Sequence, residues 1–425
     1  MTRTQPPPVA RQLSVRAIME TILRRGATSR AELAKLTGLS RQTTTQVVLE
    51  LERDGWLQVS GRMQGPLGRS APVYEVNPAS AYVLGIRLEG SVLQMAVADI
   101  RGDVVAETSE PTDPRGGREV AHQVGRMFQA LVAAAGIRRD KVRLGVMGTP
   151  GVVEPKSGSI GIAPSIPHLS DINVVAEMGA ELNLALSIEN GVKLAALGEL
   201  WQGEARGARN FAYFGIGSGV GMGIVSDGKL LRGGRGAAGE IAFLPVGGDP
   251  FDPAGFADGT FEMAVNSAAV IRRYEGYGGA AGGTVGEIFL ALNAGDRAAA
   301  AAIDETARLL VLAISSVYAV VDPELFVLGG SIGRRSEIRD RIRDLLPRAI
   351  PQFIDIKTGS LGDRATLVGA LGQALDQLHA ELFGVEALDS QAAERARLDV
   401  QVSHNAHAPE DTAPGRSGRR ISLPA

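Results

Sequence analysis

The stretch Phe211–Val225, FAYFGIGSGVGMGIV, decides the fold class of this chain. An apolar run leads into alternating glycines, which predicts a strand, a glycine turn and a second strand. Glycine lets backbone N–H groups turn toward an anion and approach it closely, as a phosphate-binding loop requires. A tightly packed β-hairpin also needs glycines. Both interpretations therefore stay open for Gly217, Gly219 and Gly221.

Length and composition limit the classes of protein to consider. A chain of 425 residues has room for two or three domains, and 44% hydrophobic with 21% charged residues is typical of a soluble globular protein. The absence of cysteine excludes disulfides and thiolate metal sites. No apolar run approaches the ~20 residues needed to span a membrane, and the N-terminal MTRTQPPPVARQ has no signal-peptide core. We therefore expect a cytoplasmic protein without contact to the membrane.

The charge is unevenly distributed along the chain. Residues 1–77 hold eleven Lys/Arg against six Asp/Glu, whereas the remainder holds thirty-three against forty-one. A small basic segment on an acidic body suits a head that binds nucleic acid. Chance variation on solvated surfaces would give the same imbalance, so charge alone does not decide the question.

Helical periodicity in the first 80 residues predicts a helix-turn-helix. The first helix, over 13–24, places Val15, Ile18, Met19 and Ile22 on one face. A capping box at 29–32 opens a second helix, and Ser40 caps a third helix over 41–53. Two short helices joined by a glycine turn form the layout that places a recognition helix in the major groove. The candidate base and phosphate contacts on that helix are Ser40, Arg41, Gln42, Thr43, Thr45 and Gln46.

A β-hairpin wing is expected after the recognition helix. Strand-like ends at 57–60 and 73–76 flank a glycine-rich segment. Arg62 and Arg69 on this wing are candidates to enter a minor groove. The alternative is that residues 13–76 form a small helical oligomerisation module.

The rest of the chain reads as a duplicated α/β body. Segments 83–88, 92–99 and 104–108 predict three strands with tight turns, followed by a helix over 119–135 and a strand over 142–147. The pattern repeats with strands at 210–216, 219–226 and 229–232, later helices and a strand at 325–328. This repeated βββαβ order is that of the actin-like or ribonuclease-H-like ATPase fold, whose two halves enclose a cleft. A doubly wound α/β fold is the alternative, but three leading hairpin strands argue against it.

The residues that follow the glycine stretch carry a family resemblance. Asp227-Gly228-Lys229-Leu230 and Arg235-Gly236-Ala237-Ala238-Gly239-Glu240-Ile241 together resemble the signature of the repressor–ORF–kinase (ROK) family. This family contains sugar kinases and sugar-responsive transcriptional repressors. The head resembles the winged helices of its repressors, such as those of N-acetylglucosamine and xylose metabolism.

Several family positions are changed in this chain. Where the resemblance places a nucleotide-binding aspartate, this chain has Arg87. Where it places a glycine turn, this chain has Glu89, whose carboxylate would repel phosphates. The resemblance places the catalytic aspartate of the kinases at Gly191, which supplies no base. It places a zinc-binding histidine at Phe243, with no cysteines to follow. We therefore expect no catalytic residues, no zinc and no other cofactor.

Three sugar-site positions of the family are retained. They are Asn190, Glu240 and Glu262, which the resemblance assigns to effector binding. For both glutamates, the alternative is a structural carboxylate that caps a helix N-terminus. The segment Leu328-Gly329-Gly330-Ser331 matches the family's adenosine region.

The sequence as a whole predicts a DNA-binding transcriptional regulator, and more specifically a repressor in carbohydrate metabolism. We expect a winged-helix domain over 1–77, a ROK domain for effector binding and oligomerisation over 80–382, and a disordered tail over 383–425. The expected partners are a double-stranded operator, a small sugar-like effector and further copies of the chain in a homodimer or homotetramer. The alternatives are an ATP-dependent sugar kinase with an accessory head, and a regulator that binds no effector.

Overall fold

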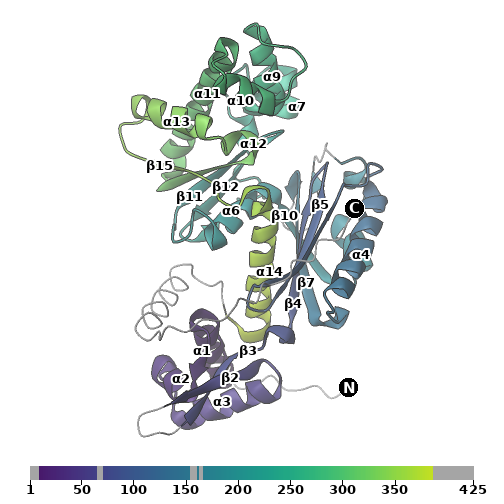
Figure 1. The fold of residues 1–425 in the computed structure, drawn as a ribbon, viewed down its shortest axis with the longest axis vertical. Coiled ribbons are helices and arrows are strands. Elements are labelled where there is room, and N and C mark those ends of the chain that lie inside the picture. Colours follow the sequence, from purple (N-terminus) through teal and green to yellow (C-terminus); the bar gives the residue numbers. More distant parts are fainter. Residues whose placement is uncertain (1–8, 65–69, 154–159, 162–165, 386–425) are drawn as a thin grey trace, which may run out of the picture. The chain divides into compact units, whose positions relative to one another are not determined.

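The computed structural model describes residues 9–64, 70–153, 160–161 and 166–385 (Figure 1). The chain forms two compact units. The first is drawn from residues 1–147, 164–188 and 370–425, and the second from residues 148–163 and 189–369. Among the described helices, none is long and apolar enough to cross a membrane. Arg69 and most of the expected tail lie outside the described residues.

The head is a winged helix-turn-helix within the first unit. Its elements are α1 (Val9–Arg25), β1 (Thr28–Ser29), α2 (Arg30–Thr37), α3 (Arg41–Arg53), β2 (Leu57–Gln64) and β3 (Ser70–Val76), with the strands in the order β1-β3-β2. Ser29 caps α2 by accepting a hydrogen bond from Glu32 N at 3.3 Å. Gly38 ends α2 in the left-handed conformation that glycine favours. The three predicted helices are confirmed, with α1 starting four residues earlier than expected.

The core of the head follows the predicted helical faces with one exception. Ile18, Met19 and Ile22 of α1 are buried as expected. Val15 is only half-buried, and Ser14 takes the interior place instead. Ser14 Oγ donates to Ala10 O at 2.9 Å, so its hydroxyl is satisfied without solvent.

The first unit also contains a five-stranded sheet. Its strands are β4 (Tyr82–Leu88), β5 (Leu93–Asp99), β6 (Val104–Glu110), β7 (Val142–Thr149) and β10 (Ala185–Asn190), in the order β10-β7-β4-β5-β6. The helices α4 (Gly117–Ala134) and α5 (Val174–Leu182) pack against each other, and α4 also contacts β5 and β6. The short strands β8 (Val152–Val153) and β9 (Ile160–Gly161) form a separate pair.

The second unit is built on another five-stranded sheet. Its strands are β11 (Phe211–Ile216), β12 (Val220–Ser226), β13 (Lys229–Leu230), β14 (Leu325–Gly329) and β15 (Asp355–Thr358), in the order β13-β12-β11-β14-β15. Its helices are α6 (Gly191–Gln202), α7 (Pro253–Asp258), α8 (Thr260–Val265), α9 (Ser267–Gly276), α10 (Val285–Asn293), α11 (Arg297–Val321), α12 (Gly330–Gly333) and α13 (Ser336–Ala349). The last helix, α14 (Ala365–Phe383), begins in this unit and continues into the first.

The two sheets have the same strand order, which confirms the predicted duplication. In each sheet three consecutive strands form one side, the strand that follows a helical segment pairs with the first of them, and a fifth strand lies at the edge. The β11–β12 and β12–β13 pairs are antiparallel, whereas β11–β14 and β14–β15 are parallel. This mixed order is that of the actin-like fold and excludes the doubly wound alternative.

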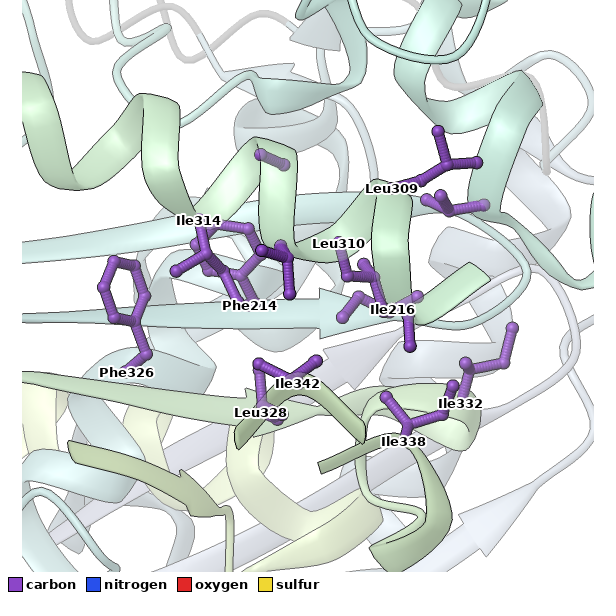
Figure 2. Close-up of a cluster of buried hydrophobic side chains, with 14 of the residues drawn as sticks. Phe214, Ile216, Leu309, Leu310, Ile314, Phe326, Leu328, Ile332, Ile338 and Ile342 are labelled. Carbon is purple, nitrogen blue, oxygen red and sulfur yellow. The ribbon is translucent and has the colours of Figure 1, made fainter. Parts of the chain in front are cut away.

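The sequence of β11 alternates between two buried faces. Phe214 and Ile216 point toward Leu310 and Ile314 of α11 in the larger core cluster, as Figure 2 shows. Phe211 and Tyr213 pack in a second cluster with Ala195 and Ala196 of α6. A strand covered on both faces has no polar alternation, so the run FAYFGI is apolar throughout.

Candidate DNA-binding head and effector site

The recognition helix α3 has the predicted bounds, 41–53. Ser40 caps it by accepting from Thr43 N at 3.1 Å, and the Ser40 and Thr43 hydroxyls are 2.8 Å apart. Thr44, Val47, Val48 and Leu51 are buried as expected. The face of α3 opposite to the core is therefore free to meet DNA.

The predicted contact residues lie on the outer surface of the head. Arg41, Gln42 and Gln46 are exposed, and Thr43 and Thr45 are half-exposed. The Ser40 hydroxyl is already used as a helix cap, so it is the candidate least free to reach a base. On the wing, Arg62 is exposed and lies opposite Pro72 in the β2–β3 ladder. Arg69 lies outside the described residues.

The glycines of the central hairpin are required for close packing. None of Gly217, Gly219 and Gly221 has positive φ, so turn dihedrals do not explain them. A Cβ on Gly221 would lie 3.1 Å from Val192 Cγ2, and one on Gly217 would lie 3.0 Å from Ser331 Oγ. Steric fit around α6 and α12 therefore accounts for glycine at these two positions.

A carboxylate lies beside this hairpin. Glu262 of α8 accepts a hydrogen bond from Val220 N at 2.8 Å through Oε2. The same oxygen would lie 3.4 Å from a Cβ on Gly219. Gly217 N donates to Gly219 O at 3.0 Å. Two N–H groups of the hairpin thus have partners within the protein, which argues against a phosphate cradle in this structure.

Glu240 is held by a loop that packs on β12. Gly239, at φ +90°, accepts from Met222 N at 3.1 Å, and a Cβ on Gly239 would lie 2.1 Å from Met222 O. This position requires glycine, because any side chain would displace the loop. Within the described part of the chain, the Glu240 carboxylate has no hydrogen-bond partner, and Glu240 makes no side-chain cap to the short helix after it. The capping alternative for Glu240 is therefore not supported.

Asn190 has a structural role at the start of α6. Its Oδ1 accepts from Val192 N at 3.0 Å and from Lys193 N at 3.3 Å, and its Nδ2 donates to Gly151 O at 2.9 Å. One amide hydrogen is left for a ligand. Gly191 follows as the first helical residue, and Thr366 Oγ1 donates to its carbonyl at 3.0 Å. No side chain projects from the place where the kinases of the family carry their base.

Lys193 is a buried cation at this site that the sequence interpretation missed. It is 2% exposed and donates through Nζ to Gly236 O. The adjacent Glu189 accepts from Arg232 Nε at 2.7 Å and from Asn190 N at 3.0 Å. A signal was present in the sequence, because a lysine in the first turn of a helix opposes the helix dipole and so needs a specific reason.

Burial dominates the ionisation of the charged groups here. It raises the pKa of Glu240, and the Lys193 ammonium opposes that increase. It also raises the pKa of Glu262, against the hydrogen bond from Val220 N. For Lys193, burial lowers the pKa, while Glu189 and Glu240 raise it. The site therefore contains groups whose charge depends on one another.

The first hairpin of the body contains an ion pair where the family has an aspartate. Arg87 donates to both carboxylate oxygens of Glu89, at 2.8 and 2.7 Å, and to Gln94 Oε1 at 2.8 Å. The Arg87 side chain is only 12% exposed. Glu89 is thus neutralised by Arg87 within the same hairpin.

The segment that carries zinc ligands in the family has a different character here. Phe243, Phe251 and Phe256 are 52%, 92% and 84% exposed. Among the residues that the structure describes, no group of three or more His, Asp or Glu side chains is arranged to hold a metal ion.

Comparisons with known proteins cover both parts of the chain. The winged helix-turn-helix DNA-binding family matches residues 13–58, and the ROK family matches residues 83–377. The xylose repressor of Caldicellulosiruptor bescii is 24% identical over 87% of this chain and 96% of its own length. The glucokinase of Halalkalibacterium halodurans is 26% identical over 68% of this chain and 93% of its own length.

Two solved structures match different shares of this chain. A ROK family transcriptional regulator, described as a homologue of the E. coli Mlc protein, has a TM-score of 0.67 at 23% identity over 93% of this chain and 99% of its own. The ROK hexokinase of Thermus thermophilus has a TM-score of 0.61 at 26% identity over 70% of this chain and 99% of its own. The chain therefore belongs to the ROK family and joins a winged helix-turn-helix DNA-binding domain to the family's sugar-kinase-like body, as a transcriptional regulator does.

Proposed function

We propose that this chain is a repressor of carbohydrate genes whose ROK domain binds a hydroxyl-rich, unphosphorylated effector without phosphorylating it. The observation that carries this proposal is the Glu240 carboxylate, which is partly buried and has no hydrogen-bond partner among the residues that the structure describes. A carboxylate in that state gains most from a ligand that donates hydrogen bonds. The xylose repressor among the relatives supports the assignment to carbohydrate genes.

The charges around Glu240 favour a neutral or amine-bearing ligand over a phosphorylated one. Arg232 is already paired with Glu189, and Lys193 already donates to Gly236 O. Glu262 adds a second carboxylate. A phosphate would meet two carboxylates at this site, where Lys193 and Arg232 already have partners, and uncompensated burial of charge is costly.

Loss of catalysis is the part of this proposal that separates it from a sugar kinase. Gly191 offers no base. In the first hairpin, the Arg87–Glu89 ion pair stands where the family's kinases have a nucleotide-binding aspartate. The glucokinase relative makes this alternative worth testing directly. An ADP-release assay with common hexoses and ATP should stay at background, and turnover would establish the kinase function instead.

Binding of DNA and effector should be measured on the same protein. A thermal-shift screen should pair each neutral sugar with its phosphorylated counterpart, and calorimetry should follow each hit. We expect hits among the neutral or amino sugars, weaker binding in Glu240→Gln, and a changed affinity for the native upstream DNA in a gel-shift titration. A ligand whose binding is indifferent to Glu240→Gln would place the effector site elsewhere.

We further propose that the chain acts as a homodimer or homotetramer. A single winged helix reads one half-site, and two copies are needed to read a symmetric operator. Light scattering coupled to size-exclusion chromatography tests this, since a monomer at the concentrations that bind DNA would contradict it.

A further inference from the structure

We propose that Lys193 is the positioning residue of the effector site: its buried ammonium ties the loop 232–240, and with it Glu240, to α6. The inference rests on the proposed function only in taking Glu240 as the residue that receives the effector. The interaction between the two residues can be measured without any ligand.

The position of Lys193 is unfavourable on its own. It is the third residue of α6, where the helix dipole disfavours a cation, and it is 2% exposed. A buried ammonium is stable only with hydrogen bonds and opposite charge around it. The hydrogen bond is to Gly236 O, which belongs to the loop that ends at Glu240. Lys193 therefore links the helix directly to the loop.

This link fixes the loop at one of two points. The other is Gly239, whose carbonyl accepts from Met222 N of β12 at 3.1 Å. Between them Ala238 N donates to Arg232 O at 3.1 Å, which closes the loop on itself. With Gly236 held by Lys193 and Gly239 held by β12, little freedom remains for the backbone of Glu240.

The opposite charge comes from Glu189, whose effect on the pKa of Lys193 is the larger, and from Glu240. The two oxygens of Glu189 also accept from Arg232 Nε and from Asn190 N. Glu240 has no hydrogen bond among the described residues, and Lys193 and Glu240 each shift the other's pKa toward the charged form. Charged groups from several elements surround Glu240. They are Lys193 on α6, Glu189 on β10, Arg232 in the loop, Glu262 on α8 and, beside Glu262, Asp258 at the end of α7. Without Lys193, Glu240 would face an excess of carboxylates.

The test is a double-mutant cycle in thermal unfolding of the full chain, with Lys193→Met, Glu240→Gln and the double variant. Each single change in Tm has an unpredictable sign, because removing a buried charge also removes its desolvation cost. The non-additive part isolates the interaction. At about pH 7.5 we expect a coupling of about 2–4 °C in Tm. The coupling should disappear as the pH falls through the raised pKa of Glu240, because protonated Glu240 has no charge to pair.

The pH profile gives a readout that a purely steric role would not change. The pKa of Glu240 in the fold lies above its value in the unfolded chain, so protonation on acidification stabilises the fold. In Lys193→Met this stabilisation should begin at a higher pH, because the opposing ammonium is gone. In Glu240→Gln it should be absent.

Two further variants keep the test decisive. Lys193→Gln retains a donor for Gly236 O without the charge, and replaces Lys193→Met if the latter does not fold. The control is Lys229→Met, an exposed lysine of β13 that carries the same change of charge and should show no coupling to Glu240→Gln. Additive Tm changes at neutral pH would overturn the role of Lys193. Failure to find an effector would count against the proposed function and leave the Lys193 result standing.

Discussion

Replacing Gly239 by alanine tests whether the loop that carries Glu240 has to lie where the structure places it. Gly239 has φ +90°, and an added Cβ would lie 2.1 Å from Met222 O, a backbone atom. Gly228 is a matched control, because it has φ +74° in the nearby β12–β13 turn but no atom within 4 Å of the added Cβ. The two variants share the cost of the backbone conformation and differ in the steric clash.

The difference in stability follows from these contacts. A non-glycine residue at such a φ costs about 1–3 kcal/mol in both variants. In Gly239→Ala the loop must also retreat from β12, which breaks the hydrogen bond from Met222 N and costs a further ~0.5–1.5 kcal/mol. Residual strain adds to this sum. We therefore expect Gly239→Ala to lower Tm by about 1–6 °C more than Gly228→Ala.

Differential scanning fluorimetry of the two variants measures this difference directly. Calorimetry with an effector found in the sugar screen then asks whether displacing the loop abolishes binding in Gly239→Ala while Gly228→Ala still binds. Equal Tm losses in the two variants would refute the reasoning, because they would show that the loop moves without resistance from β12.

Three other predictions concern the head, the pH dependence and the core. Arg41→Ala and Gln42→Ala should each reduce sequence-specific affinity for DNA by ~1–3 kcal/mol per lost base contact in gel-shift titrations. Arg53→Ala, at the far end of α3, is the control and should leave this affinity unchanged. Unchanged specific binding in Arg41→Ala would contradict the assigned recognition helix. Burial lowers the pKa of His379, which contacts Ile100 O through Nε2 at 2.8 Å and has no partner for Nδ1. The stability that neutral His379 contributes is therefore present above about pH 6.5 and lost as the pH falls, so a His379→Leu variant should have a flatter profile of Tm between about pH 7 and pH 5. Leu310→Ala in the core of Figure 2 should cost ~2–5 kcal/mol, measured by chemical denaturation, and a loss below ~1 kcal/mol would show that this core is loosely packed.

Features set by neighbouring residues were predictable from the sequence. Ser40 and the inward face of α3 follow from a capping signal and helical spacing, and both are confirmed. The duplicated strand pattern was predictable because each leading hairpin is marked by its own turn, and the strand orders of the two sheets confirm it. The edge strand β15 was missed, because four residues with polar Asp355 and Lys357 carry no strand pattern. It forms only because β14 offers a parallel partner.

Features set by distant segments were not predictable from local pattern. The glycines of the central hairpin suggested a phosphate loop, but Gly221 meets Val192 and Gly217 meets Ser331, which come from other elements. For Lys193 the local pattern shows only that a lysine in the first turn of α6 is unusual; its partner Gly236 lies forty-three residues further along the chain and was not predictable. The assignment of Asn190, Glu240 and Glu262 to effector binding stays a prediction that the proposed variants test.

In the first hairpin of each of the two sheets, a carboxylate of the chain itself makes the polar contacts. Glu89 is held by Arg87 in the first, and Glu262 receives a backbone N–H of the second. In an ATP-driven relative, such hairpins would register whether nucleotide is present. If these internal contacts keep nucleotide out of both hairpins, as the proposed loss of catalysis implies, affinity for DNA should follow the supply of effector and remain indifferent to the energy state of the cell.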